Sequence, residues 1–406
     1  IPTYLIALAA GNLESRQLGP RSCTWSEPET ADAAAFEFAE IERMIETAEG
    51  VFGPYDWDRY DLLVLPPAFP YGGMENPRLT FLPPTLIAGD RSLVAVVAHE
   101  LAHSWTGNLV TNATVNDFWL NEGFTVWAER RLLEALYGPD HGALSWALGM
   151  HRLESAFQRF GTDSPFTRLR QDLWNVDPDS VYSEVPYEKG ARFVVLLERA
   201  VGRARFDAFI RAYMKAFRFT SITTEEFMAF LEDELPGVAA RVNAEAWLYE
   251  PGLPDNAPEF PSDRVQGLRA LSEGWRQGRR PTADEADSLS PLELLVYLQG
   301  LPRPMTMTDC EWLDGHFQLT GRGNYEILVE WLTIAAASGF EPAFPRLKEV
   351  LTSVGRMKYL KPLYAALGSS ARSRAWSREV YAEARDRYHP LSRLVVEEVF
   401  KGYPAD

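Results

Sequence analysis

The spacing of apolar residues changes along the chain, and each change predicts a different kind of element. Residues 1–12 form one apolar run that predicts a strand with no partner strand close behind it. We interpret it as the residual last strand of an N-terminal β domain missing from this chain. Residues 13–90 mix strand patterns with one helix over 33–53 and a buried strand, YDLLVLPP, closed by paired prolines.

Helical spacing dominates the rest of the chain. It runs first from about residue 91 to 250. A proline-rich stretch without an apolar period then predicts a linker over 253–268, after which helical spacing resumes. Beyond it, Ser290-Pro291-Leu292-Glu293 supplies an N-cap, a first-turn proline and a capping box, and Thr308 with Glu311 predicts a second box. The expected fold is therefore mainly α with a small β part. A domain over 13–252 is followed by stacked, solenoid-like helices over 269–406.

Composition and charge narrow the classes of function. Hydrophobic residues make up 46% of the chain and charged residues 24%, as in globular proteins. The formal net charge of −17 argues against a nucleic-acid partner, which would require a basic surface. No apolar run approaches the roughly 20 residues needed to span a membrane. With only two cysteines we expect no disulfide framework, and we expect a cytoplasmic monomer.

The segment HELAH carries the strongest chemical signal. His99 and His103 are four residues apart, so on a helix they project from the same face and can bind one zinc ion. Glu100 lies beside them as a candidate general base. The alternative is a pair of core histidines with a chance glutamate. The surrounding helix is apolar almost all round, however, and burying these three polar side chains there is costly unless something binds them.

A third zinc ligand is expected near the histidines, because catalytic zinc usually takes three protein ligands. Glu122 follows His103 after eighteen residues, at the start of a second helix that can return antiparallel to the first. Glu129, seven residues further on, lies on the same helix face and could orient a ligand imidazole. A solvent-exposed charge is the alternative interpretation of Glu129.

These motifs, together with GGMEN at residues 72–76, resemble those of the gluzincin zinc aminopeptidases, whose signatures are GxMEN and HExxH-x18-E. Further segments, RQLGPR, FPYGGMENP, HSWTGNLVTN, VPYEKG, SITT, WLYEPGLP and GRMKY, are similar to the leukotriene A4 hydrolase and aminopeptidase B branch over essentially the whole chain. Thr106 favours the hydrolase side of that branch. The resemblance implies a thermolysin-like zinc catalytic domain with one zinc ion, followed by the helical domain.

The resemblance also implies roles for other residues. Glu75 would bind the free α-amine of a peptide, while Gly72, Gly73 and Met74 would line the path of its backbone. Tyr187 would donate a hydrogen bond to the tetrahedral oxyanion. The remaining implied roles are binding of the terminal carboxylate by Arg356 and Lys358, and handling of a lipid epoxide by Asp179 and Tyr182. Asp179 would also bear on a preference for a basic first residue.

The expected activity is removal of the N-terminal residue from short peptides with a free N-terminus. Hydrolysis of a lipid epoxide, as in leukotriene A4 hydrolase, is the first alternative, possible in the same enzyme. Phe124 stands where that hydrolase has histidine, which puts the epoxide activity in doubt. A catalytically silent scaffold that binds partners through its helices is the alternative from another class.

Overall fold

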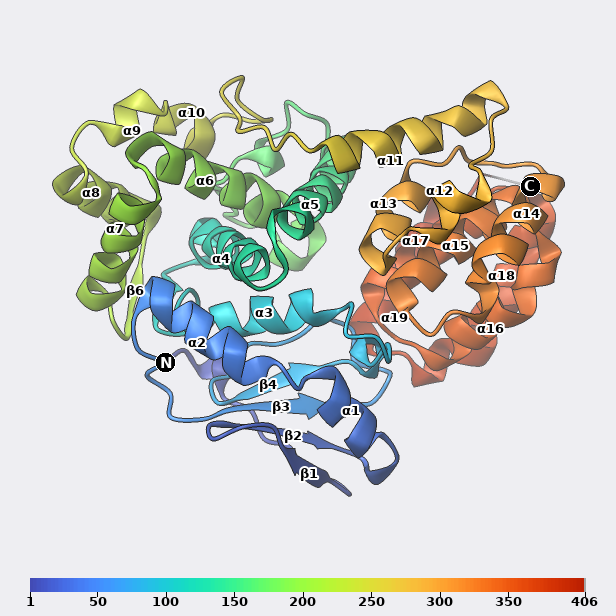
Figure 1. Ribbon diagram of the computed structural model, residues 1–406, viewed down its shortest axis with the longest axis horizontal. Coiled ribbons are helices and arrows are strands. Elements are labelled where there is room, and N and C mark those ends of the chain that lie inside the picture. The colour runs from blue at the N-terminus through green and yellow to red at the C-terminus, as the bar shows by residue number, and fades with distance from the viewer. Residues whose placement is uncertain (405–406) are drawn as a thin grey trace.

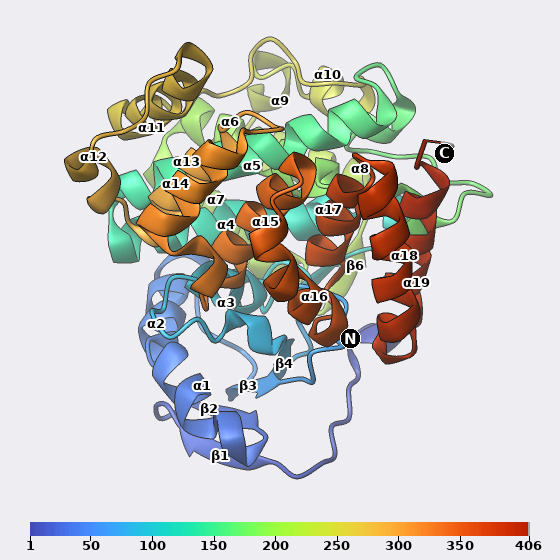
Figure 2. The same cartoon turned by 90° about the vertical axis from the view of Figure 1, so that its right-hand side faces the viewer.

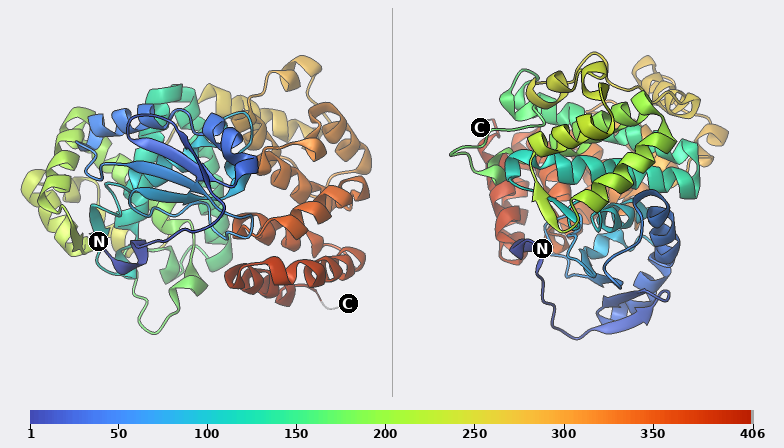
Figure 3. Two further views of the ribbon diagram at one scale, coloured as in Figure 1. Left: turned by 90° about the horizontal axis from the view of Figure 1, so that it is seen from below. Right: turned by 90° about the vertical axis from the view of Figure 1, so that its left-hand side faces the viewer.

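The computed structural model describes residues 1–404 and contains a small sheet, a central group of helices and a C-terminal helical array (Figure 1). Two separate hydrophobic cores hold these parts. One runs from Ala34 to Leu248, and the other from Val265 to Val396 with Leu144 of the central helices. Viewed from below, the sheet lies in front of the central helices and the helical array lies beside them (Figure 3).

The sheet has the order β1-β2-β3-β4, with strands Glu14–Gln17, Ser22–Ser26, Tyr60–Val64 and Leu79–Leu82. β1 is antiparallel to β2, and the other pairs are parallel, with Leu62 of β3 opposite Thr24 and Thr80. Every residue of β3 is buried, as expected for the apolar run YDLLV in a central strand. The helix α1 (Ala31–Glu37) packs on β1 and β2, whereas α2 (Ile41–Phe52) packs on three of the central helices described next.

The central helices carry the ligand motifs. They are α3 (Val94–Ala102), α4 (Trp119–Tyr137), α5 (Pro139–Phe160), α6 (Gly190–Val201), α7 (Arg203–Ala216), α8 (Thr224–Glu234), α9 (Val238–Arg241) and α10 (Ala244–Tyr249). A short parallel pair, β5 (Val110–Asn112) and β6 (Thr220–Ile222), joins two of their loops. α4 packs on α3, α5 and α6, so the motif helix α3 and its partner α4 lie in the middle of the first core.

The C-terminal array begins after residue 262. It contains α11 (Asp263–Gly274), α12 (Ala283–Asp287), α13 (Pro291–Gln299), α14 (Met307–Phe317), α15 (Tyr325–Ser338), α16 (Phe344–Ser353), α17 (Met357–Leu367), α18 (Ala371–Ala384) and α19 (Pro390–Lys401). Each of α11, α13, α15, α17 and α19 packs on the next, forming one layer of a solenoid-like stack (Figure 2). The predicted fold class is thus confirmed. No helix of residues 1–404 is long and apolar enough to cross a bilayer.

Several predicted boundaries are wrong. Residues 1–12 form no strand: Thr3–Leu5 is a 3-10 turn, and Ile6 and Leu8 are largely exposed, because no strand of the described chain lies beside them to pair with. The helix over 33–53 is two helices, divided at residues 38–40 where Phe38 and Ile41 both turn into the core.

Two predicted features after the central helices also differ in detail. The linker ends at Ser262, whose hydroxyl caps α11, so residues 263–268 are helical. The N-cap of α14 is Thr306, not Thr308, because its hydroxyl accepts a hydrogen bond from the amide of Asp309. The capping box of Ser290 and Glu293 is present as predicted.

Candidate active site

The HELAH segment forms the end of α3, and its two imidazoles face each other. His99 lies in the last turn and His103 is the C-cap, with their Nε2 atoms 3.1 Å apart. Glu122, in the first turn of α4, brings its Oε2 atom to 3.3 Å from His99 Nε2 and 3.6 Å from His103 Nε2. The spacing of the motifs and the packing of α3 on α4 therefore bring the three predicted ligand atoms together.

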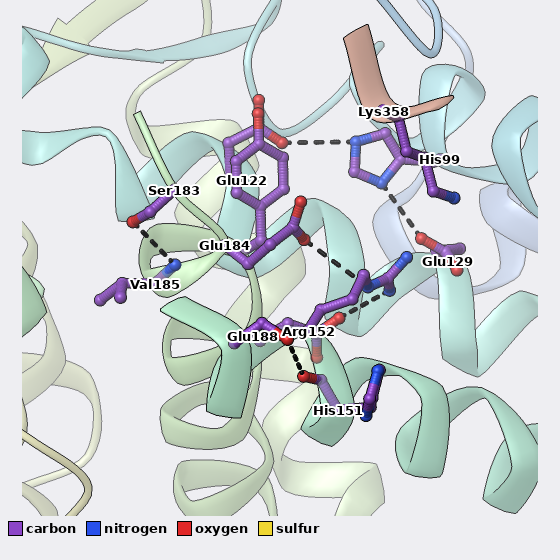
Figure 4. A network of polar contacts seen from close by, with 12 residues as sticks. His99, Glu122, Glu129, His151, Arg152, Ser183, Glu184, Val185, Glu188 and Lys358 are labelled. Atoms are coloured by element: carbon purple, nitrogen blue, oxygen red, sulfur yellow. Dashed lines mark hydrogen bonds and ion pairs between the residues drawn. The ribbon is translucent and has the colours of Figure 1, made fainter. Parts of the chain in front are cut away.

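The outward-facing nitrogen of each imidazole is held by a second group. His99 Nδ1 lies 3.1 Å from Glu129 Oε2, the position expected for an orienting carboxylate (Figure 4). His103 Nδ1 lies 3.0 Å from the carbonyl oxygen of Thr106 and 3.1 Å from Thr125 Oγ1. A carbonyl accepts a hydrogen bond only from Nδ1–H, so the Nε2 lone pair of His103 is left free to bind a metal.

The chemistry of this cluster fits zinc. Glu122 Oε2 is buried and accepts no hydrogen bond from residues 1–404, which is costly for a carboxylate oxygen unless a cation binds it. Burial alone would raise the pKa of Glu122, but His103 and His99 lower it below the usual value. Two imidazole nitrogens and one carboxylate oxygen are the donors that catalytic zinc takes, with a further position open to solvent.

Glu100 points from α3 towards the loop that carries GGMEN. It is 6% exposed, and burial raises its pKa well above the usual value; Glu75 and Glu122 raise it further. A Cβ atom at Gly73 would collide with the Glu100 carboxylate, and one at Gly72 would lie 2.8 Å from Arg356 Nη2. The glycine pair is therefore required because two functional side chains pack directly against its backbone.

The rest of GGMEN lies along the edge of the sheet. Met74 exchanges two backbone hydrogen bonds with Phe81 of β4, of 2.9 and 3.0 Å. The carbonyl of Glu75 accepts a 2.7 Å hydrogen bond from Asn108 Nδ2, which fixes the backbone beneath a half-buried carboxylate. Asn108 was not predicted as a site residue, although it lies within the quoted segment HSWTGNLVTN.

Tyr187 lies in a π-helical turn, Val185–Lys189, immediately before α6. Its ring is stacked near the His99 ring with centroids 6.3 Å apart, and its hydroxyl is 2.8 Å from that of Tyr182. The neighbouring Glu188 is fully buried and binds Arg130 at 2.6 Å and Arg152 at 2.7 Å, which anchors the turn (Figure 4). Sequence reasoning missed this anchor.

Arg356 and Lys358 approach from the helical array. Arg356 is the N-cap of α17 and is 3% exposed, while Lys358 follows in the first turn. Glu326, at the start of α15, lies 3.6 Å from Arg356 Nη1 and 2.7 Å from Lys358 Nζ. Burial opposes the charge of Glu326, but Lys358 and Arg356 lower its pKa to about 2. Apart from its place in a predicted helix, nothing in the local pattern marks Glu326 as a site residue.

The predicted site residues share one cavity of about 2230 Å³. Its walls come from the central helices, the GGMEN loop and the layer of α13, α15, α17 and α19. Every predicted site residue lines it: Gly72, Gly73, Met74, Glu75, His99, Glu100, His103, Glu122, Asp179, Tyr182, Tyr187, Arg356 and Lys358. The two cores therefore meet around a single cleft, with the ligand cluster in its wall.

The comparison with known proteins agrees with this arrangement. Residues 36–246, more than half of the chain, match the peptidase family M1 domain, and residues 289–400 match the C-terminal domain of leukotriene A4 hydrolase. The chain belongs to peptidase family M1. The predicted family resemblance and enzyme class, a zinc metalloaminopeptidase, are thereby confirmed.

Relatives within the M1 family share most of the chain. It is 39% identical to a leukotriene A-4 hydrolase of Xenopus laevis, over 98% of this chain and 67% of that protein. It is 39% identical to leucine aminopeptidase 2 of Yarrowia lipolytica, over 98% of this chain and 65% of that protein. The structure of yeast LTA4 hydrolase with bestatin matches with a TM-score of 0.91 and 34% identity, covering 99% of this chain and 69% of that one. The chain thus spans about two thirds of the length of these relatives.

Phe124 does not line the cavity of this M1 protein. Its ring is fully buried and packs on Trp119, Tyr213 and Phe227 in the first core. The departure from the hydrolase pattern at this position therefore changes the packing behind α4. Thr106 is also buried, and its hydroxyl lies 2.6 Å from that of Thr125, which contacts His103.

Proposed function

We propose that this chain is the catalytic part of a zinc aminopeptidase that removes the N-terminal residue from short peptides. The observation that carries the proposal is the convergence of His99, His103 and Glu122 beside a buried Glu100 in the cavity that also contains Glu75. We propose one zinc ion on the three ligands, a catalytic domain over 13–252 and a helical domain over 269–406. We further propose that it acts as a monomer in the cytoplasm.

In the proposed mechanism each step falls to a side chain of this cleft. His99, His103 and Glu122 would hold the zinc ion, which would supply Lewis-acid chemistry beside the scissile carbonyl. Glu100 takes a proton from the attacking water as the water oxygen bonds to the carbonyl carbon. It then gives that proton to the leaving amine nitrogen as the C–N bond breaks. The hydroxyl of Tyr187 donates a hydrogen bond to the oxyanion that forms between these two events.

The two ends of the cleft select the two ends of a short peptide. The carboxylate of Glu75 would accept hydrogen bonds from the ammonium group of the first residue, which makes the enzyme an exopeptidase. Arg356 and Lys358 share one carboxylate, Glu326, so this group retains one net positive charge. That charge suits the single terminal carboxylate of a peptide.

The amine requirement gives a direct test. A tripeptide with a free N-terminus should lose its first residue, whereas the same tripeptide with an acetylated N-terminus should be cleaved at least about 100-fold more slowly, because Glu75 then faces no cation. Mass spectrometry of the products gives both rates. Equal cleavage of the two peptides, or cleavage at an internal bond, would contradict the proposal.

Replacement of Arg356 separates binding of the peptide's terminal carboxylate from the chemistry at the zinc site. Arg356→Ala should lower kcat/KM for tripeptides roughly 10–100-fold, because a charge-assisted pair to the terminal carboxylate is lost. An amino-acid anilide, which has no carboxylate, should lose less than about threefold. Arg346→Ala is the matched control, since Arg346 pairs with Glu349 away from the cavity. An equal loss on both substrates would rule out the carboxylate role.

Epoxide hydrolysis is a second candidate, because relatives bear the name leukotriene A-4 hydrolase and the cavity has an apolar wall. Leu292, Leu295, Leu391, Leu394 and Val395 from α13 and α19 line it. Tyr182 and Asp179 line the same cavity. Incubation with a fatty-acid epoxide followed by product analysis tests this candidate: an enzyme-dependent diol supports it, and only the spontaneous hydrolysis products argue against it.

A further inference from the structure

The position of the Tyr187 hydroxyl depends on the turn Val185–Lys189, which carries this residue. A tyrosine side chain has only two rotatable bonds, so its hydroxyl follows its backbone. The hydroxyl lies 2.8 Å from that of Tyr182, but Tyr182 is itself 48% exposed and offers no buried anchor. The ring meets Phe118 edge-on, with centroids 5.9 Å apart. The contacts that hold the turn itself therefore decide where the hydroxyl lies.

Glu188, the next residue, joins the turn to three helices. Its side chain is fully buried, and its carboxylate accepts hydrogen bonds from Arg130 of α4 at 2.6 Å, Arg152 of α5 at 2.7 Å and Arg192 of α6 at 3.1 Å. Figure 4 shows Arg152 beside Glu188. Arg192 Nη1 also donates to the main-chain carbonyl of Glu188 at 3.2 Å. This arginine cluster thus holds both the side chain and the backbone of the turn.

Two of the three arginines are themselves fixed by α5. The guanidinium carbon of Arg130 lies 3.9 Å from the centre of a ring of Trp146, and Arg192 Nη2 donates to the Trp146 carbonyl at 3.3 Å. A Cβ atom at Gly149, further along α5, would overlap Glu188 Oε2 and Arg130 Nη2. A glycine inside a helix is normally destabilising. Its presence here is explained by the direct packing of the carboxylate and the guanidinium against the helix backbone.

The carboxylate of Glu188 stays charged in this setting. Burial opposes the charge, but the guanidiniums of Arg130, Arg152 and Arg192 lower the pKa of Glu188 far below its usual range. Hydrogen bonds between charged groups are shorter and stronger than neutral ones, so the cluster restricts the backbone that carries the carboxylate. Loss of the carboxylate would leave buried guanidiniums without their partner, and the turn would lose its anchor.

We propose that Glu188 is a positioning residue, whose buried carboxylate fixes the turn so that the Tyr187 hydroxyl meets the oxyanion. The inference rests on the proposed aminopeptidase function and on the role of Tyr187 in it. The alternative is an ion cluster that only stabilises the packing of α4, α5 and α6. The two roles differ in one respect, since positioning matters only while the hydroxyl of Tyr187 is present.

A double-mutant cycle measures that difference. Glu188→Gln should lower kcat for a tripeptide roughly 10–100-fold and change KM less than about threefold, because a catalytic group misplaced by about 1 Å can cost this much. In the Tyr187→Phe background the same substitution should lower kcat by less than about threefold, since the hydroxyl that it positions is gone. An equal loss of kcat in both backgrounds, or an unchanged kcat in Glu188→Gln, would overturn the positioning role.

Glu198→Gln is the matched control. Glu198 is also a buried carboxylate, on α6, and it accepts hydrogen bonds from Trp127 Nε1 at 2.6 Å and Arg203 Nε at 2.8 Å, but it does not line the cavity. This variant should lose thermal stability as Glu188→Gln does, while its kcat changes less than about threefold.

Glu188→Asp replaces Glu188→Gln in the cycle if the latter does not fold. It keeps the charge but shortens the side chain by one methylene group, which draws the carboxylate away from its partners. We expect a loss of kcat of roughly 3–30-fold, which should again be absent in the Tyr187→Phe background. An unchanged kcat, or an equal loss in both backgrounds, would overturn the proposal here too.

Fluorine NMR separates this inference from the proposed function. With Tyr187 labelled as a ring-fluorinated tyrosine, the folded Glu188 variant should shift or broaden its resonance, and Glu198→Gln should leave it unchanged. An unchanged resonance in the Glu188 variant would overturn the positioning role. If the wild-type chain removes the N-terminal residue but the cycle shows equal losses, the proposed function stands and the inference fails. If the chain cleaves no tripeptide, the proposed function fails, and the resonance alone decides whether Glu188 positions Tyr187.

Discussion

Glu100→Gln is expected to lower kcat for a tripeptide by roughly 10²–10⁴ while zinc remains bound, because a carboxamide cannot accept the proton of the attacking water. The substitution keeps the size of the side chain, which matters because Glu100 packs against Gly73 in a space with no room for a Cβ atom. Glu100 is not one of the three converging ligands, so the metal site should survive. Stopped-time peptide assays and the zinc content of the same sample measure both effects.

Glu398→Gln serves as the control for Glu100→Gln. Glu398 also lines the cavity, but its carboxylate pairs with Lys401 at the far wall, so kcat should change less than threefold. A Glu100→Gln protein that retains zinc and turns over at a near-normal rate would remove Glu100 as the base. A protein that has lost its zinc would instead show that Glu100 supports the ligands.

Tyr187→Phe should lower kcat by about 10²–10³ with little change in KM, because the hydroxyl is needed by the oxyanion and not by the ground-state carbonyl. Burial raises the pKa of Tyr187 well above its usual value, so the hydroxyl stays protonated and able to donate at any working pH. Steady-state kinetics with a tripeptide separate the effects on kcat and KM.

The hydrogen bond between Tyr187 and Tyr182 requires a second variant. Tyr182→Phe removes the same 2.8 Å contact but keeps the hydroxyl of Tyr187. We expect it to cost less than about tenfold in kcat. Equal losses in the two variants would mean that the contact between the tyrosines, and not stabilisation of the oxyanion, explains the effect of Tyr187→Phe.

The sequence predicts the parts of this site that depend on local spacing. His99 and His103 are one helical turn apart, and Glu122 begins the next helix, so the positions of the ligands follow from helix geometry and one antiparallel return. The family resemblance supplied Glu75, Tyr187, Arg356 and Lys358, which come from separate loops and helices. Their common cavity depends on how the two cores pack, and no local pattern encodes that packing.

The residues that sequence reasoning missed act through tertiary contacts. Glu326 meets Lys358 across 32 positions of the chain, and Glu188 meets Arg130 across 58. A charged residue on an amphipathic helix looks the same in sequence whether it faces solvent or a buried partner. The break between α1 and α2 was missed for a similar reason, since no glycine or proline marks residues 38–40.

The most direct test of the account is removal and return of zinc, followed by activity on a tripeptide with a free N-terminus. The wild-type chain should contain about one zinc per molecule, lose N-terminal residue release when a chelator removes it, and recover when zinc is restored, whereas Glu122→Gln should bind zinc at least tenfold more weakly. A chain that releases N-terminal residues without zinc, or that binds zinc equally well after Glu122→Gln, would contradict the assignment of His99, His103 and Glu122 as the catalytic metal site.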